Sequence, residues 1–299
     1  MVKQFAISIN IEDIVCLVGI MILASWLLRT SLGRKSLAET EPRRNNMPIY
    51  LPFVALFIWL GAVSMLDSGF SMLVEYRVLG IKYRDAFFDN FILCIGALAT
   101  IAVIIFLARV SFARRLRGFG LDIKTIHRDL LAAPLNLLSV WPILLVTIIL
   151  TTRIGRLIWG QEYQIPQHEE LKIISAHPQL PIRILIIITA VLVAPVLEEM
   201  LFRGLFQTMI RSNLDDRYRQ LDTRQASRIE NRAGRAAWGS ILISSMIFTT
   251  VHYNMAHWPA LFVLALCLGY AYEKSGSLLR PIFIHCLFNA ITIAAALNG

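Results

Sequence analysis

Two adjacent glutamates, Glu198 and Glu199, stand in the most apolar part of the chain, and Arg203 follows one helical turn later. An ionisable residue at bilayer depth is costly, so a function is its default explanation. On a helix Glu199 faces Arg203, and their charges can compensate each other. The neighbours of Glu198 at helical spacings are all apolar. We therefore predict that Glu198 is a catalytic base, supported by Glu199 and Arg203.

Two later apolar segments supply histidines. Phe248 and His252 are one helical turn apart, so the phenyl ring can pack beside the imidazole. His285 and Asn289 likewise place an imidazole and a carboxamide on one helix face. A carboxylate with one histidine can hold and deprotonate a water. A second histidine with an amide can donate hydrogen bonds to the oxyanion that forms when a peptide carbonyl is attacked. Together these residues predict a water-using active site buried in a membrane.

The same residue types permit other functions. Two imidazoles and one carboxylate, from His252, His285 and Glu198, can hold Zn²⁺ with an open coordination position. We expect no cofactor and keep a zinc-dependent hydrolase as the alternative. A third hypothesis, of another class, is a non-proteolytic membrane protein that binds a peptide, such as an immunity factor. It predicts that Glu198→Ala preserves the cellular role.

The composition sets the class of protein around these residues. Of 299 residues, 57% are hydrophobic and only 16% are charged, which is too apolar for a soluble protein. We predict an all-α, polytopic integral membrane protein with about eight transmembrane helices enclosing a polar cavity. The expected spans are residues 14–28, 49–66, 91–108, 130–150, 182–210, 236–252, 258–272 and 281–297.

The formal charge of +9 lies in the loops and predicts the orientation. The loops after the first and third spans, residues 29–44 and 109–128, are rich in arginine and belong in the cytoplasm by the positive-inside rule. With eight spans, both termini then lie outside a bacterial cytoplasmic membrane. The predicted partners are the lipid bilayer and a membrane protein or lipid-linked peptide as substrate. The sequence predicts no nucleic-acid partner and no particular oligomer.

The chain divides into three expected regions. Residues 1–130 form a transmembrane scaffold with basic cytoplasmic loops and an interfacial helix over residues 114–131. Residues 131–180 hold the fourth span and a polar, irregular outer loop. Residues 181–299 form the catalytic core, interrupted by a basic insert at residues 211–235. We interpret this insert as a solvated helix near anionic lipid, with docking of a charged substrate tail as the alternative.

Three motifs in order, EExxxR at 198–203, FxxxH at 248–252 and HxxxN at 285–289, resemble the CPBP family of intramembrane proteases. This family includes the type II CAAX prenyl endopeptidase and bacteriocin-processing and immunity proteins. The resemblance covers residues 181–298. The insert at 211–235 departs from it, because the link between the first two motifs is longer than is usual.

The resemblance implies an eight-helix fold with a conical cavity. In it Glu198 would activate water with help from His252, and His285 and Asn289 would match the oxyanion-binding pair. The family has been described both as metalloproteases and as glutamic proteases without a metal. We therefore expect an intramembrane endopeptidase that cleaves near the membrane end of its substrate.

Overall fold

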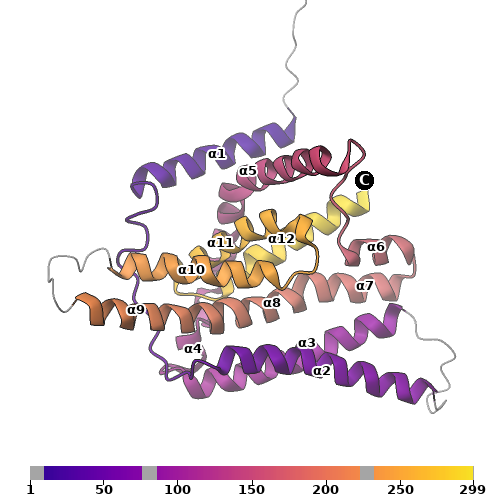
Figure 1. Ribbon diagram of the computed structural model, residues 1–299, viewed down its shortest axis with the longest axis horizontal. Coiled ribbons are helices and arrows are strands. Elements are labelled where there is room, and N and C mark those ends of the chain that lie inside the picture. Colours follow the sequence, from indigo (N-terminus) through magenta and orange to yellow (C-terminus); the bar gives the residue numbers. More distant parts are fainter. Residues whose placement is uncertain (1–9, 76–85, 223–231, 299) are drawn as a thin grey trace, which may run out of the picture.

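The computed structural model of the protein describes residues 10–75, 86–222 and 232–298. Most of the long helices run side by side along the long axis of the molecule (Figure 1). The described α-helices are α1 (Ile11–Arg29), α2 (Leu51–Glu75), α3 (Ala86–Ser111), α4 (Arg115–Phe119), α5 (Ile126–Trp159), α6 (Glu169–Ala176), α7 (Leu180–Ile188), α8 (Ala194–Glu199), α9 (Thr208–Asp222), α10 (Arg232–Thr250), α11 (Trp258–Ser275) and α12 (Leu279–Asn298).

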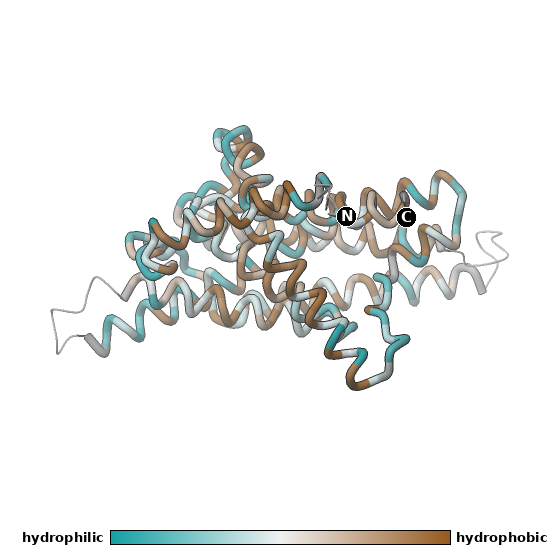
Figure 2. Tube along the Cα trace, turned by 90° about the horizontal axis from the view of Figure 1, so that it is seen from above, coloured by the Kyte–Doolittle hydropathy of each residue, from teal (hydrophilic) through white to brown (hydrophobic). Residues whose placement is uncertain are grey.

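The predicted all-α membrane fold is confirmed. Within the described ranges, six helices are long and apolar enough to cross a membrane: Leu51–Met72, Phe87–Ser111, Ile123–Trp159, Leu180–Gln220, Met255–Ser275 and Leu279–Leu297. Large apolar side chains such as Phe57 and Phe106 are about two-thirds exposed, as expected of helices that face lipid. Figure 2 shows hydrophobic residues over much of the long helices and hydrophilic residues gathered toward the connections.

The count of eight spans is not confirmed. All eight apolar segments form helices, but α1 and α10 are not among the six that are long and apolar enough to span a membrane. Helix α10 carries Arg235 and several serines and threonines, which lower its hydropathy.

The helix connections gather at two opposite ends of the molecule. At one, which we call the basic end, Arg211 donates to the Thr40 carbonyl and the Leu278 amide donates to the Gly120 carbonyl. At the other, which we call the α6 end, the rings of His168 and His257 stack. Figure 1 places α6 and the C-terminus together, far from the free end of α9. This arrangement is what alternating helix directions across a bilayer produce.

One helical rod, residues 180–222, crosses the centre of the structure. It contains two π-helical stretches, η2 (Thr189–Val193) and η3 (Met200–Gln207), between its α-helical parts. In η2 the amide of Ala194 bonds to the Thr189 carbonyl, five residues back. The next donor in that register is Pro195, which has no N–H. The Ala190 carbonyl is therefore open to a partner from another helix, and π-helical turns of this kind are frequent at functional sites.

The expected interfacial helix over residues 114–131 is not continuous, and that prediction was wrong. Helix α4 ends at Phe119, and Gly120 adopts a left-handed φ of +104°. A Cβ at Gly120 would lie 2.8 Å from the Leu278 amide nitrogen, so the chain turns here against the start of α12. The chain continues as a short 3₁₀ turn, η1 (Ile123–Thr125), before α5 begins.

The outer loop was also predicted wrongly as irregular. Helix α5 continues to Trp159, and α6 forms within the remaining segment. The hydroxyls of Thr151 and Thr152 bond to carbonyls one turn back, so these polar residues are accommodated inside the helix. Gly160, with a φ of +99°, follows the end of α5.

Candidate active site

The carboxylate of Glu199 joins two of the predicted motifs. Arg203 Nη1 donates to Glu199 Oε1 at 2.9 Å, and His285 Nδ1 lies 2.9 Å from the same oxygen. All three side chains are buried. Arg203 also donates to the Ala265 carbonyl at 3.4 Å, and its guanidinium lies 4.4 Å from the centre of the Phe248 ring. Because His285 Nδ1 and Arg203 Nη1 meet the same carboxylate oxygen, the imidazole can donate its Nδ1–H to Glu199 in the same way as the guanidinium does.

The other nitrogen of His285 faces Glu198. Nε2 is 3.9 Å from Glu198 Oε2, which is too long for a direct hydrogen bond. The Glu198 side chain is 17% exposed, whereas that of Glu199 is fully buried. Polar groups at this separation are commonly bridged by a water. His285 thus stands between a buried carboxylate that orients it and a second carboxylate in contact with a cavity.

This cavity has a volume of ≈ 140 Å³. About 15 Å³ of such space admits one water molecule, so the cavity can take several waters or part of a peptide. Its lining consists of His168, Leu171, Ala190, Ala194, Glu198, His252, Leu261, His285, Phe288, Asn289, Thr292 and Ile293. The four residues predicted as catalytic are thus brought to one cavity, and Glu199, Arg203 and Phe248 lie behind it.

His252 was expected on the sixth span, and this placement was wrong. Helix α10 ends at Thr250, and His252 lies in the following turn. Its Nδ1 is 2.7 Å from the Phe248 carbonyl oxygen, and Trp258 Nε1 donates to the His252 carbonyl at 2.8 Å. The expected ring contact with Phe248 is present, with centroids 4.7 Å apart. Because a carbonyl accepts from Nδ1, Nε2 is the acceptor nitrogen of the neutral ring.

Asn289 forms a hydrogen bond with the Ala190 carbonyl, which Pro195 cannot reach because it has no N–H. Asn289 Nδ2 donates to the Ala190 carbonyl at 2.8 Å. This bond uses one of the two amide hydrogens and fixes the carboxamide beside the cavity. The π-helical turn thereby decides where Asn289 points. One N–H remains for a ligand in the cavity.

A buried polar stripe extends from Glu199 toward the basic end, and we did not predict it. Its members are spaced four residues apart: Glu199, Arg203, Gln207, Arg211 and Asp215. None exposes more than 4% of its surface. The repeat of polar residues at helical spacing was a visible signal for a buried face. The interpretation of the insert as a solvated helix was therefore wrong for Arg211 and Asp215, and residues 223–231 of the insert lie outside the described residues.

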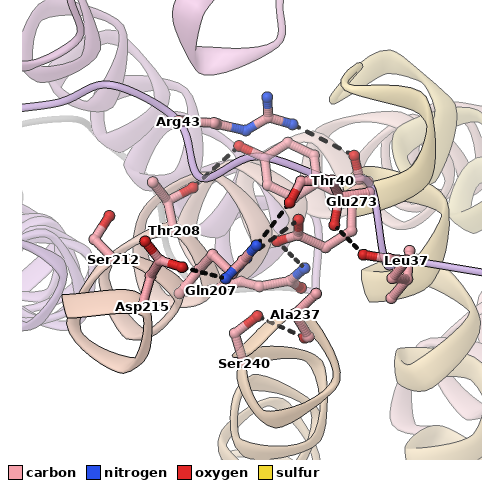
Figure 3. A network of polar contacts seen from close by, with 12 residues as sticks. Leu37, Thr40, Arg43, Gln207, Thr208, Ser212, Asp215, Ala237, Ser240 and Glu273 are labelled. Carbon is pink, nitrogen blue, oxygen red and sulfur yellow. Dashed lines mark hydrogen bonds and ion pairs between the residues drawn. The ribbon is translucent and has the colours of Figure 1, made fainter. Parts of the chain in front are cut away.

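The stripe is held by α10, α11 and the segment after α1 (Figure 3). Gln207 donates to the Gly269 carbonyl at 3.1 Å and to Glu273 at 3.3 Å, and it accepts from Ser244. Arg211 donates to the Thr40 carbonyl at 2.8 Å. Arg211 also forms ion pairs with Asp215 at 3.6 Å and with Glu273 at 3.9 Å. These contacts compensate the buried charges of the stripe and tie it to the neighbouring segments.

The three side chains considered as zinc ligands are not grouped as a metal-binding set among the described residues. Over the described ranges, no three His, Cys, Asp or Glu side chains are grouped to hold a metal ion. Glu198, His252 and His285 line one cavity without meeting this condition.

The fold and cavity define a polytopic membrane protein with a carboxylate–histidine site. Residues 180–291 match the family model described as type II CAAX prenyl endopeptidase Rce1-like, which confirms the resemblance for this part of the chain. The chain is also similar to an uncharacterized 24.3 kDa protein of Escherichia coli, with 27% identity over 135 residues. That similarity covers 44% of this chain and 54% of the relative, so the chain spans about half the length of the curated relative. No solved structure matches the chain.

Proposed function

We propose that the protein is an intramembrane endopeptidase that hydrolyses a peptide bond near the membrane end of its substrate with a water activated by Glu198. The observation that carries this proposal is the position of His285, with Nδ1 at 2.9 Å from Glu199 and Nε2 at 3.9 Å from Glu198. The match of residues 180–291 to an endopeptidase family supports the same class of reaction.

The first step places a water between Glu198 and the acceptor nitrogen of His252. Glu198 takes one proton as the water oxygen bonds to the peptide carbonyl carbon. The second hydrogen of the water bonds to His252 and orients the attack. The electrons of the carbonyl π bond move to the carbonyl oxygen, which becomes an oxyanion, and the carbonyl carbon becomes tetrahedral.

The oxyanion needs hydrogen-bond donors within the cavity. Asn289 has one amide hydrogen that is not used by Ala190. His285 Nε2 is the second donor when the ring carries a hydrogen on both nitrogens. Collapse of the intermediate breaks the C–N bond, and the proton held by Glu198 passes to the leaving amine. The products are a carboxylic acid and an amine, and Glu198 is ionised again.

The decisive experiment compares wild type with Glu198→Gln. Both proteins are reconstituted in lipid vesicles with a library of membrane-anchored peptides, and products are identified by mass spectrometry. Cells carrying wild type or Glu198→Ala are compared in the same way to find the natural substrate. Glu162→Gln, on an exposed residue, is the matched control.

We expect cleavage by wild type and Glu162→Gln and none by Glu198→Gln. A folded Glu198→Gln variant that cleaves like wild type would eliminate this mechanism. If neither protein cleaves and Glu198→Ala keeps its cellular role, the peptide-binding hypothesis replaces the enzyme.

A further inference from the structure

We infer that the catalytic cavity receives its substrate from the α6 end of the molecule and that this end is extracytoplasmic. The inference rests on the proposed function, because it assigns a substrate class to the same site. The expected substrate is then a polypeptide whose cleavage site enters the bilayer from outside, and not a lipid-modified C-terminus in the cytoplasm.

The cavity lining lies on the α6 side of the catalytic carboxylate. His168 and Leu171 come from the start of α6, and His252 comes from the turn after α10. Thr292, one turn beyond the end of the HxxxN motif, continues the lining toward the C-terminal end of α12. Ala190 precedes Glu198 on the central rod, on the part that begins beside α6. The open path from Glu198 therefore leads to the α6 end.

The opposite direction is closed. From Glu199 toward the basic end, the central rod continues into the buried polar stripe. Arg203 donates to the Ala265 carbonyl of α11. Gln207 bonds to α11 and Arg211 to the segment after α1 (Figure 3). Phe119 and Tyr272 are fully buried beside it, and the Tyr272 hydroxyl donates to the Phe119 carbonyl. A peptide arriving from the basic end would have to break this network.

The charges define which end is cytoplasmic. Exposed cations crowd the basic end, among them Arg34, Lys35, Arg44, Arg114, Arg117 and Lys124. At the α6 end, the described residues expose fewer cations, namely Arg153, Arg156 and Lys172, and the turn at residues 251–257 contains no Lys, Arg, Asp or Glu. The positive-inside rule places the basic end in the cytoplasm and the α6 end outside.

The entrance suits an extended peptide backbone. His168 stacks on His257, with centroids 3.9 Å apart and planes 19° apart, so its ring is held at the cavity. Imidazole and amide groups can each donate to and accept from peptide groups. We therefore expect the cavity to bind a peptide segment through its backbone, with little demand for a charged side chain.

The test uses single cysteines and an impermeant thiol reagent on right-side-out and inverted membrane vesicles. Cys16, Cys94, Cys267 and Cys286 are first replaced by alanine. Tyr253→Cys at the α6 end and Asp216→Cys at the basic end, both exposed, report the orientation. Leu171→Cys and Thr292→Cys report the cavity. Detergent-purified samples show that each variant is folded.

We expect Tyr253→Cys, Leu171→Cys and Thr292→Cys to react in right-side-out vesicles and Asp216→Cys only in inverted ones. Reaction of the two cavity cysteines from the same side as Asp216→Cys overturns the proposed entrance. Reaction of Tyr253→Cys only in inverted vesicles overturns the orientation. Cavity cysteines that react from neither side, yet react after unfolding, show a closed cavity and also contradict the inference.

The labelling needs no catalysis, so its failure is distinct from failure of the proposed function. Repeating it in Glu198→Gln should give the same labelling pattern. In vesicles containing active protein, a peptide anchored so that its cleavage site lies on the α6 side should be cut at least tenfold faster than the same peptide in the reverse orientation.

Discussion

Glu199 Oε1 lies 2.9 Å from His285 Nδ1, although the two residues are 86 positions apart in the chain. The same oxygen accepts a hydrogen bond from Arg203 at 2.9 Å. One buried carboxylate thus balances a guanidinium from its own helix and orients an imidazole from another. The other carboxylate, Glu198, is free of the pair with Arg203 and can take part in proton transfer.

Replacing Glu199 by glutamine should damage stability as well as activity. It leaves the buried Arg203 without its counter-charge, which costs about 3–5 kcal/mol of the free energy of unfolding. It also removes the acceptor that orients His285. We expect a lower unfolding temperature in detergent and at least a 10-fold loss of kcat/KM. The double variant Glu199→Gln, Arg203→Met should recover stability but not activity, and a stable, active Glu199→Gln would contradict the assigned role.

Pro195→Ala should separate stability from activity. The new N–H competes with Asn289 for the Ala190 carbonyl, because residue 195 is the next donor in the π-helical register. Removing a proline from inside a helix should raise the unfolding temperature, while the released Asn289 amide should lower kcat. Parallel thermal unfolding and peptide-cleavage assays test this, and an unchanged kcat would show that Asn289 is not positioned by this carbonyl.

Asn289→Ala should lower kcat more than it raises KM, because it removes a donor that acts on the developing oxyanion. Loss of one such donor costs about 100-fold or more in other enzymes. Asn136→Ala is the matched control. Asn136 also donates to a backbone carbonyl, that of Ala132, but it does not line the catalytic cavity. Equal effects of the two substitutions on kcat would point to a purely structural role.

Gly269→Ala should loosen the buried polar stripe. Its Cβ would lie 2.8 Å from Gln207 Oε1 and 3.0 Å from a methyl of Ile241. Overpacking of this kind costs about 1–3 kcal/mol. In Gly61→Ala the new Cβ meets nothing within 4 Å, so this control should keep or raise the unfolding temperature. Similar unfolding temperatures for both variants would mean that Gln207 can move without cost.

Cleavage should survive chelation. In the proposed mechanism Glu198 activates the water without a metal, so we expect purified protein to retain its rate after treatment with EDTA and to contain less than about one zinc per ten chains. Activity that disappears with chelator and returns on addition of zinc would instead support the zinc-dependent hydrolase.

The local relationships were accessible from the sequence because a helix repeats every 3.6 residues. The EExxxR spacing alone brings Arg203 to Glu199, and the apolar segments alone predict the helices that carry EExxxR, Phe248 and HxxxN. Composition and loop charge are equally local properties, so the class of protein followed from them. Nothing beyond the identity and spacing of residues was needed for these predictions.

Tertiary packing decided the rest. The choice of Glu199 rather than Glu198 as the partner of His285 depends on how α12 lies against the central rod. The burial of Arg211 depends on contacts with Thr40 and Glu273, which are distant in the chain. A charged residue at a helix end can face solvent or a neighbouring helix, and only the arrangement of the neighbours determines which. The path into the cavity also depends on tertiary packing, because only the folded chain places α6 at one end of the site and the buried stripe at the other.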